Sequence, residues 1–426
     1  MISESAHWHF VFPEYSLMGT LIALYFKHIN TSVPILHRPT FETNVGEGLH
    51  LRDRYFGAVV LLVCALGSRY TDDPRTLPEG YPNRHAAGYM WFEQVPWLRK
   101  SLLESPCLYE VQLYALASFY LLSTSSPQAA WTTCGVALRF CQALGVHRKN
   151  SRRKAADGQH WKRVFWSLII ADRIYSSFMG RACCIQSEDI DIDLPAECDD
   201  EYWDTGDPST SFKQPPGKPS QMAYMTCLAQ LSEILAFALR NLYSTKKYLT
   251  LVGHTGPDWE RQMVSDLDSA LNKWLDSVPD FLRWDPNRED PQFFEQSCSL
   301  YCIFYHTQIQ IHRQFISKKS PLMFTSLAIC TNAARSCSRL FSLMIRRGAI
   351  VSIPQHMILA FTAGVVLLMN IWGGKKTGLV NDPVHEMSDV QACLDFLKIM
   401  ESGFSIILCP SIESVVADLD YCHSDG

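Results

Sequence analysis

The chain has 426 residues, of which 47% are hydrophobic, and its net charge is −5 at neutral pH. This apolar content supports a large folded core and excludes an intrinsically disordered chain. The acidic balance argues against a protein that holds DNA through a basic surface, because such a surface shows as clustered Lys and Arg. The densest basic run, at 148–154, is short and is interpreted as a solvated loop between two helices.

Helical periodicity dominates the chain, because apolar residues recur every three or four positions. In the first half this spacing predicts helices over 17–30, 52–68, 109–122, 131–144 and 160–179. Gly145 and Gly180 are placed to end the last two of these helices. In the second half it predicts helices over 221–243, 259–278, 291–317, 326–346, 354–372 and 390–401. The sequence therefore predicts an all-α protein, a multi-helix compact domain with long loops.

Two segments need separate interpretation. Residues 187–194 alternate apolar residues with Asp, which favours a short extended segment whose acids face water. A calcium loop is excluded there, because Leu194 stands where that loop requires glycine. The apolar run 357–372 is shorter than the roughly 20 residues that span a bilayer, and we interpret it as a fully buried core helix.

A stretch rich in Pro and Gly, from Asp204 to Ser220, is predicted to be a linker or surface loop. Both flanking halves have helices too apolar to stand alone, so we expect one compact unit. The predicted organisation is a short N-terminal segment (1–16), an N-terminal helical part (17–205), the loop or linker (206–220) and a C-terminal helical part packed on the first (221–426).

Fifteen cysteines are present and none falls in a C-x-x-C pair. Zinc sites usually present their thiolates from such short knuckles, so no zinc site is predicted. An odd cysteine count and no secretory signal predict reduced thiols packed as small hydrophobic residues.

The stretch FWSLIIADRIYSSFMGRAC, which begins at Phe165, places a charge pair inside an apolar helix. A buried carboxylate is costly unless it is paired, so we predict an interior clamp in which a bidentate arginine satisfies Asp172. The candidate residues for this structural clamp are Arg139, Arg163, Asp172, Arg173 and Arg181. Arg139, Asp172 and Arg181 could instead line a ligand pocket, whose position stays unknown from the sequence.

Motifs for catalysis are missing: there is no phosphate-binding glycine loop, no HExxH and no G-x-S-x-G. No catalytic, cofactor-binding or metal-binding residue is therefore predicted. The pairs Asp72-Asp73 and Asp199-Asp200 keep open an α-helical enzyme acting on a lipid- or terpene-like substrate. His306 and His312 are six residues apart, on different faces of a helix, and do not make a natural metal pair. A role in capping helix carbonyls is favoured for His37.

Several segments, in this order, resemble a known family. YFKHINTSVPILHRPTF (25–41), WTTCGVALRFCQALGVHR (131–148), KRVFWSLIIADRIYSSFMGR (162–181) and SEDIDIDLP resemble the regulatory domain of fungal zinc-cluster transcription factors. This domain is also called the middle homology region, of the xylanolytic transcriptional activator type. YHTQIQIHRQF (305–315) and CTNAARSCSRL (330–340) resemble its C-terminal helices. Ala182 stands where the family usually has proline.

The resemblance implies an all-helical transcription-regulatory domain that acts in the nucleus and is not an enzyme. It implies partners among regulatory proteins or the transcription machinery. It leaves open whether the chain binds a small-molecule inducer and whether it forms a homodimer. A ligand-free interaction scaffold is an alternative, and no membrane association is expected.

Family members usually carry an N-terminal six-cysteine zinc cluster that reads DNA. Residues 1–16 contain no Cys, Lys or Arg. We therefore expect that module and its zinc to be absent from this chain, either because the chain is a fragment or because the protein lacks the module. The inducer, the target genes and the choice between activation and repression do not follow from the sequence.

Overall fold

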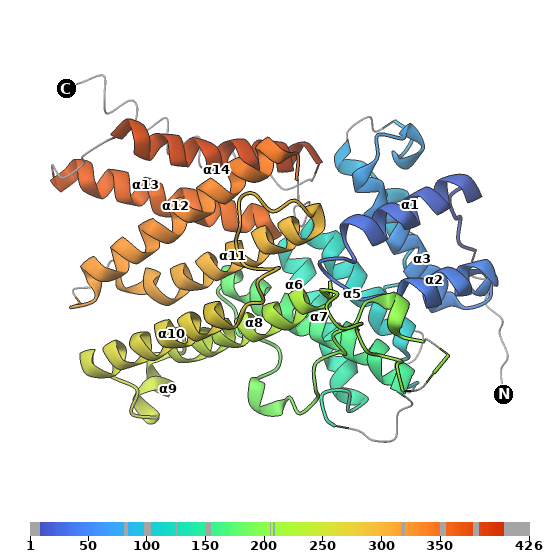
Figure 1. Cartoon of the computed structure of the whole chain (residues 1–426), viewed down its shortest axis with the longest axis horizontal. Coiled ribbons are helices and arrows are strands. Elements are labelled where there is room, and N and C mark those ends of the chain that lie inside the picture. Colours follow the sequence, from blue (N-terminus) through green and yellow to red (C-terminus); the bar gives the residue numbers. More distant parts are fainter. Residues whose placement is uncertain are drawn as a thin grey trace. The chain divides into compact units, whose positions relative to one another are not determined.

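The computed structural model describes residues 9–80, 84–97, 104–124, 126–149, 155–204, 206–207, 209–316, 320–349, 355–377 and 383–403. These residues contain fourteen α-helices and no β-strand, which confirms the predicted all-α class. The chain divides into two compact units (Figure 1). The first consists mainly of Met1–Ile169 and Glu188–Met222, and the second mainly of Ile170–Ser187 and Ala223–Ser402.

The boundary between the units differs from the predicted division at 206–220. The helix α7 (Ala155–Met179) begins in the first unit and ends in the second. The loop at 206–220 belongs wholly to the first unit. The Pro- and Gly-rich composition correctly predicted that this segment is an exposed loop. An exposed loop does not have to separate two units.

The first unit is built around α3 (Arg54–Gly67), which is buried from Phe56 to its end. A helix that is apolar on all sides belongs in the interior. It packs against α1 (Tyr15–His28) and α5 (Leu108–Leu122), and α5 packs in turn against α6 (Pro127–Ala143). Gly67 allows the close approach of α1, because a Cβ at this position would collide with the carbonyl oxygen of Leu21. The short helices α2 (Arg38–Gly46) and α4 (Tyr89–Phe92) complete the described helices of this unit before α7.

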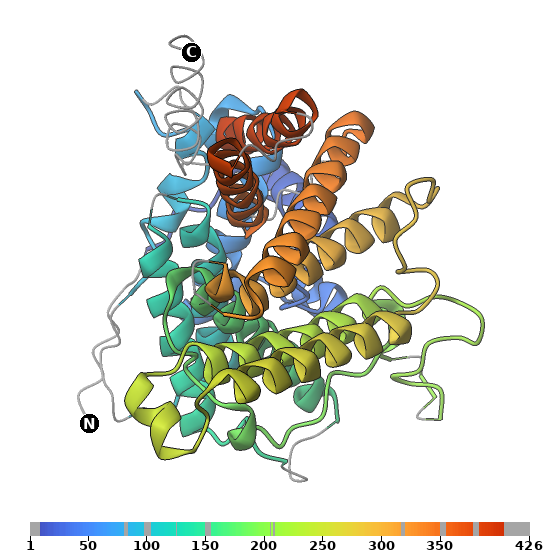
Figure 2. The same cartoon turned by 90° about the vertical axis from the view of Figure 1, so that its left-hand side faces the viewer.

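The second unit is organised by α11 (Pro291–His312), which is buried along most of its length. It packs against α8 (Ala223–Leu242), α10 (Pro257–Ser277), α12 (Met323–Arg347) and α13 (Gln355–Thr377). Figures 1 and 2 both show α8 and α10 side by side, and the indole N–H of Trp274 on α10 donates to the Cys227 carbonyl on α8 at 2.9 Å. The short α9 (Lys246–Leu251) lies between them in sequence.

The last helix among the described residues, α14 (Pro383–Gly403), packs against α12. The rings of Phe341 and Phe396 stack with centroids 4.4 Å apart, and the Ser338 hydroxyl donates to Asp389 at 2.7 Å. Figure 1 shows α14 beside α12 and α13, and α12 also packs against α13.

Both glycine stop signals are confirmed. Gly145 and Gly180 have positive φ angles of 65° and 62°, which glycine adopts without a steric penalty. After Gly180 the Arg181 N–H donates back to the Ser176 carbonyl at 3.1 Å, and the Val146 N–H does the same to Cys141 at 2.9 Å. Each bond closes the last turn of its helix in the manner typical of glycine C-caps.

The predicted extended segment at 187–194 contains no strand. It starts with a 3-10 turn (Ser187–Asp189) and then runs without a strand partner among the described residues. The alternation of exposure is as predicted, since Asp191 and Asp193 are exposed whereas Ile190 and Ile192 are partly buried. The alternating pattern shows that one side of the segment is covered by the protein, but it does not require a β-sheet. The Asp191 N–H donates to the His147 carbonyl, and the segment does not pair with a strand among the described residues.

The helix α13 corrects another prediction, because it is not fully buried. It is the one helix among the described residues that is long and apolar enough to cross a membrane, and 56% of its apolar window is buried. Core helices pass the same length and composition test. Met369 and Trp372 are 51% and 61% exposed. All sides of α13 carry apolar residues, but α11 and α12 cover only part of the surface of this helix.

The described cysteines are free thiols, and most are buried, as expected for small hydrophobic residues. The three that are only partly buried are Cys107, Cys183 and Cys184. Burial raises the pKa of Cys183 to about 12, so this thiol stays protonated at neutral pH.

Candidate functional site

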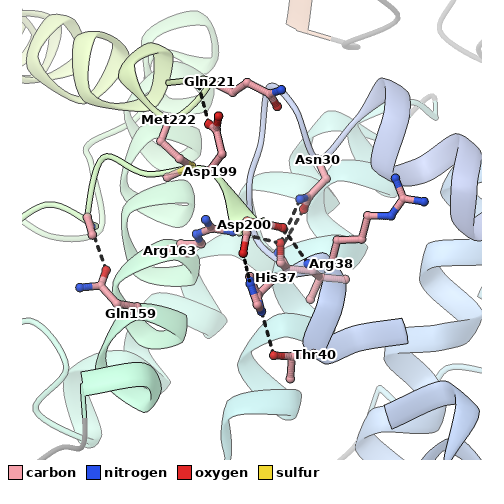
Figure 3. Close-up of polar contacts among 12 residues, drawn as sticks. Asn30, His37, Arg38, Thr40, Gln159, Arg163, Asp199, Asp200, Gln221 and Met222 are labelled. Carbon is pink, nitrogen blue, oxygen red and sulfur yellow. Dashed lines mark hydrogen bonds and ion pairs between the residues drawn. The ribbon is translucent and has the colours of Figure 1, made fainter. Parts of the chain in front are cut away.

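Two of the segments that carry the family resemblance, 25–41 and 162–181, meet the stretch around Asp200 at a buried arginine in the first unit (Figure 3). Arg163, on α7, is 1% exposed, and its guanidinium donates to the Asp200 carboxylate at 2.6 Å. The same guanidinium lies over the Trp203 ring, 4.3 Å from its centroid. A planar, weakly hydrated guanidinium can bind a carboxylate along its edge while its face stacks on an aromatic ring.

Asp200 connects this arginine to the start of α2. One carboxylate oxygen takes the Arg163 bond, and the other accepts the backbone N–H of Arg38 at 2.8 Å. Arg38 is the first residue of α2, where backbone N–H groups lack partners inside the helix. A carboxylate there also interacts favourably with the helix dipole. Asp200 therefore joins α7 and α2 through one side chain.

His37 fills the space between Asp200 and Trp203. Its Nε2 lies 3.1 Å from the Asp200 carbonyl oxygen, which only accepts, so Nε2 carries the proton. Its Nδ1 then accepts from the Thr40 hydroxyl at 2.8 Å, and its ring stacks on Trp203 at 4.0 Å. Burial lowers the pKa of His37, which keeps the ring neutral in this arrangement. The prediction that His37 caps carbonyls of the preceding helix is therefore wrong, because its partner is distant in sequence.

The turn before α2 is fixed by Asn30. Its side-chain amide donates to the Leu36 carbonyl at 2.9 Å and accepts the Leu36 N–H at 3.1 Å. The Leu36 carbonyl lies 3.4 Å from Arg163 as well. The quoted segment 25–41 thus reaches α7 through backbone as well as side-chain atoms.

Asp199 anchors the Pro- and Gly-rich loop. Its carboxylate accepts from the Gln214 amide at 2.9 Å, the Ser220 hydroxyl at 3.2 Å and the Gln221 N–H at 2.8 Å. The loop is mostly exposed, as predicted, yet its middle and its C-terminal end are both held by one buried carboxylate.

The two acidic pairs do not form an enzyme-like cluster. Asp199 and Asp200 bind the partners described above, and those bonds use both carboxylates. Asp72 pairs with Arg84 at 3.0 Å, and Asp73 pairs with Arg75 at 2.7 Å. The described carboxylates of both pairs are thus engaged in structural contacts.

Asp172 and Arg173 lie in the second unit and are both 1% exposed. Asp172 accepts the Cys184 N–H at 2.7 Å, and the Ser176 hydroxyl is a second hydrogen-bond partner. Burial raises the pKa of Asp172 to about 7, and the Cys184 bond, the Arg173 charge and Ser176 oppose this rise only in part. The predicted bidentate arginine is therefore not its partner among the described residues.

Arg173 is buried and makes its own network of contacts. It donates to Glu233 at 2.5 Å and to the Ser232 hydroxyl at 3.0 Å, both on α8. It also donates to the Ser187 hydroxyl at 3.2 Å. The adjacent charges Asp172 and Arg173 thus hold different segments, because neighbouring helix positions point about 100° apart.

Arg139 and Arg181 are exposed, so the structure does not bring these two candidates into the buried clusters of their own units. Arg163, Asp172 and Arg173 are buried where a clamp requires them. Their energetic role stays a prediction, and it is tested below.

Several polar residues on α11 are buried, and the sequence did not show which residues they would contact. His306 contacts the Ser177 hydroxyl at 3.0 Å, and burial lowers the pKa of His306 to about 3. His312 contacts Asp268 at 3.1 Å and Ser326 at 3.0 Å. The two histidines have separate partners, as their spacing predicted. Within the described residues no group of three His, Cys, Asp or Glu side chains is arranged to hold a metal ion.

Comparison with known proteins identifies the family. Residues 22–276 match the fungal specific transcription factor domain, which is more than half of the chain. The chain belongs to this family. The residues around Arg163 and those around Arg173 all lie inside the matched region of this fungal transcription factor domain.

Curated relatives agree with this assignment. An uncharacterized transcriptional regulatory protein of Schizosaccharomyces pombe is 27% identical over 60% of this chain and 34% of its own length. The transcriptional activator protein acu-15 of Neurospora crassa is 22% identical over 89% of this chain and 41% of its own length. An ABC-transporter-regulating transcription factor of Aspergillus oryzae is 23% identical over 90% of this chain and 44% of its own length. No solved structure matches the chain.

Two consequences follow for this fungal transcription factor domain. The matched relatives are transcription regulators and not enzymes, in line with the structural use of the acidic pairs. The chain spans less than half the length of these relatives, although the similarity covers most of the chain itself, including the region of α11 to α14.

Proposed function

We propose that this chain is the regulatory domain of a fungal transcription factor, and that it controls transcription in the nucleus by binding an inducer or a partner protein. The observation that carries the proposal is the Arg163 cluster. Two family segments far apart in sequence, 25–41 and 162–181, are joined through the ion pair of Arg163 with Asp200, within the region that matches the family. The engaged acidic pairs leave no comparable support for the enzyme alternative.

The mechanism is a shift between arrangements of packed helices. A ligand that binds one arrangement more tightly than another changes their populations by its difference in affinity. Helices joined by buried polar contacts favour discrete arrangements over continuous deformation, because a half-satisfied buried network is costly. A ligand-free scaffold would lack this response.

A thermal-shift screen tests the proposed sensing. We expect a cognate small molecule to raise the melting temperature of the chain, without being consumed, because it binds the folded state only. Regulatory proteins of the same cells are tested in the same way. Turnover of the stabilising compound would contradict the proposal and support an enzyme.

DNA contact is proposed to come from a separate zinc-cluster module. We expect this chain alone to show no sequence-selective binding to duplex DNA in a gel-shift assay at physiological salt. Its net charge of −5 gives little of the phosphate attraction on which DNA affinity depends. Selective binding that resists competitor DNA would contradict this expectation.

A further inference from the structure

Several hydrogen-bond donors of the Arg163 cluster have no partner among the described residues. Arg163 donates through Nη1, to the Asp200 carboxylate at 2.6 Å (Figure 3) and to the Leu36 carbonyl at 3.4 Å. Within the described part of the chain its Nε and Nη2 are buried without an acceptor, and so is the indole N–H of Trp203. Arg163 and Trp203 are only 1% and 4% exposed. Buried donors are normally hydrogen-bonded, because an unpaired one destabilises the fold.

The unpaired donors lie on the edges of one stack. The Arg163 guanidinium carbon is 4.3 Å from the centre of the Trp203 ring, and the centre of the His37 ring is 4.0 Å from it. Both groups approach the indole too closely to share one face, so they lie on opposite faces. The N–H groups of a guanidinium and of an indole point outward in the plane of each group. A ligand therefore reaches this stack at its edge, where Arg163 and Trp203 present donors only.

The cluster lacks acceptors and does not lack charge. The Arg163 charge is balanced by Asp200, and Asp199, the preceding residue, brings a second carboxylate to the same turn. An anion would be repelled by these two carboxylates. A cation would find their oxygens already engaged in the hydrogen bonds described above. An uncharged acceptor, such as the carbonyl oxygen of an amide or a ketone, matches the unpaired donors without adding charge.

Phe212 covers part of the Trp203 edge from the Pro- and Gly-rich loop. The two ring centroids are 5.6 Å apart, and the Phe212 N–H donates to the Tyr202 carbonyl at 2.8 Å. Among the described residues, Phe212 is the one residue other than glycine with a positive φ, at 59°. A bulky side chain in this conformation strains the backbone, and such strain is frequent at sites that open for a ligand. The loop around it is mostly exposed, so Phe212 can leave Trp203 without unpacking a helix.

We propose that the edge of the Arg163–Trp203 stack binds a small uncharged molecule through a carbonyl oxygen, and that Phe212 is the lid over this site. The inference rests on the proposed function, because it names the chemical class of the inducer. A carbonyl oxygen has two lone pairs and accepts from donors of this kind. A small molecule fits better than a peptide, since the donors are buried and a single ring has to move aside.

NMR of the indole N–H groups in the full chain tests the site. The chain has eleven Trp residues, and ¹⁵N-labelled tryptophan makes each indole visible. Trp203→Phe identifies the Trp203 signal, because it removes this N–H and keeps an aromatic ring. N-methylacetamide is the probe, since it is small, uncharged and has one amide carbonyl. We expect a saturable shift of the Trp203 signal, with a dissociation constant on the order of 10 mM, and no saturable shift of the other indoles.

Charged probes and lid variants sharpen this test. Acetate and methylammonium, at matched concentration and ionic strength, are expected to cause no saturable shift of the Trp203 signal. Phe212→Ala is expected to lower the dissociation constant of N-methylacetamide at least about threefold, because more molecules then have an open site. It also confirms the assignment, since it removes the ring beside Trp203. Phe237→Ala is the matched control, because Phe237 lies exposed on α8 in the second unit.

Three outcomes would overturn the proposal. A Trp203 signal that responds to no probe would show that water alone fills the edge. An equal response to acetate would show an anion site, and unchanged affinity in Phe212→Ala would remove the lid. The indole signal reads binding at Trp203 only. A silent Trp203 in a chain that still changes reporter transcription when tethered to DNA would therefore refute this site and leave the regulatory function intact.

Discussion

Arg163→Ala is expected to destabilise the first unit by about 3–5 kcal/mol, the usual cost of removing one partner of a buried ion pair. Arg163 is fully buried, whereas Asp200 retains partial solvent access. The substitution leaves Asp200 with only the Arg38 N–H and removes the cation from the Trp203 ring. Urea unfolding followed by circular dichroism measures the loss.

Arg139→Ala on α6 is the matched control, because Arg139 is exposed and surface substitutions of this kind change stability by less than about 0.5 kcal/mol. Arg163→Lys keeps the charge but loses the planar contact with Trp203, so we expect an intermediate cost. An Arg163→Ala protein that unfolds at the same urea concentration as the wild type would show that the ion pair is not a clamp.

Asp172 is expected to make the second unit less stable as pH rises from about 4 to about 7. Burial raises its pKa to about 7, against 3.8 for an exposed Asp, so the folded state holds a proton that the unfolded state has lost. Stability from this group is therefore full below about pH 4, falls by up to about 1.4 kcal/mol per pH unit, and levels off above pH 7.

Two variants separate this titration from the hydrogen bond. Asp172→Asn keeps an oxygen for the Cys184 N–H and does not titrate, so its stability should exceed that of the wild type increasingly up to pH 7. Asp172→Ala leaves the Cys184 N–H without its acceptor, at a cost of about 1–3 kcal/mol. Urea unfolding at pH 4, 5.5, 7 and 8 measures both. Identical pH profiles for wild type and Asp172→Asn would refute the titration, and an Asp172→Ala protein as stable as Asp172→Asn would refute the bond.

The long helices could be predicted from the sequence because their apolar faces have a strong period of 3.6 residues. The short helices α2, α4 and α9 could not, since fewer than three turns give too little periodicity. The helix α13 was recognised as a helix, but its composition could not tell which side its neighbours cover. The alternation at 187–194 reported exposure correctly and gave no information on whether a second strand exists.

The buried charges lie in the helix where the clamp was predicted, but their contacts differ from the predicted ones, and the clamp itself stays a prediction. A charge inside an apolar helix shows that a partner must exist, because burying an unpaired charge is costly. It does not show which partner, since the bonds to Asp172 come from Cys184 and Ser176 and the acid for Arg163 comes from Asp200, beyond the helix. His37 was noted in the sequence but given another role, and Trp203 was not singled out. Contacts between residues far apart in sequence depend on the fold.

Tethering the full chain to an unrelated DNA-binding module in a fungal cell tests the regulatory function most directly. Transcription of a reporter that carries binding sites for that module is measured for the wild type, Arg163→Ala and Arg139→Ala, with nuclear protein levels matched. We predict that the wild type and Arg139→Ala change reporter transcription, in one direction, relative to the module alone, and that Arg163→Ala does not. A folded, nuclear wild-type fusion whose reporter output equals that of the module alone, with and without stabilising ligand, would contradict the account.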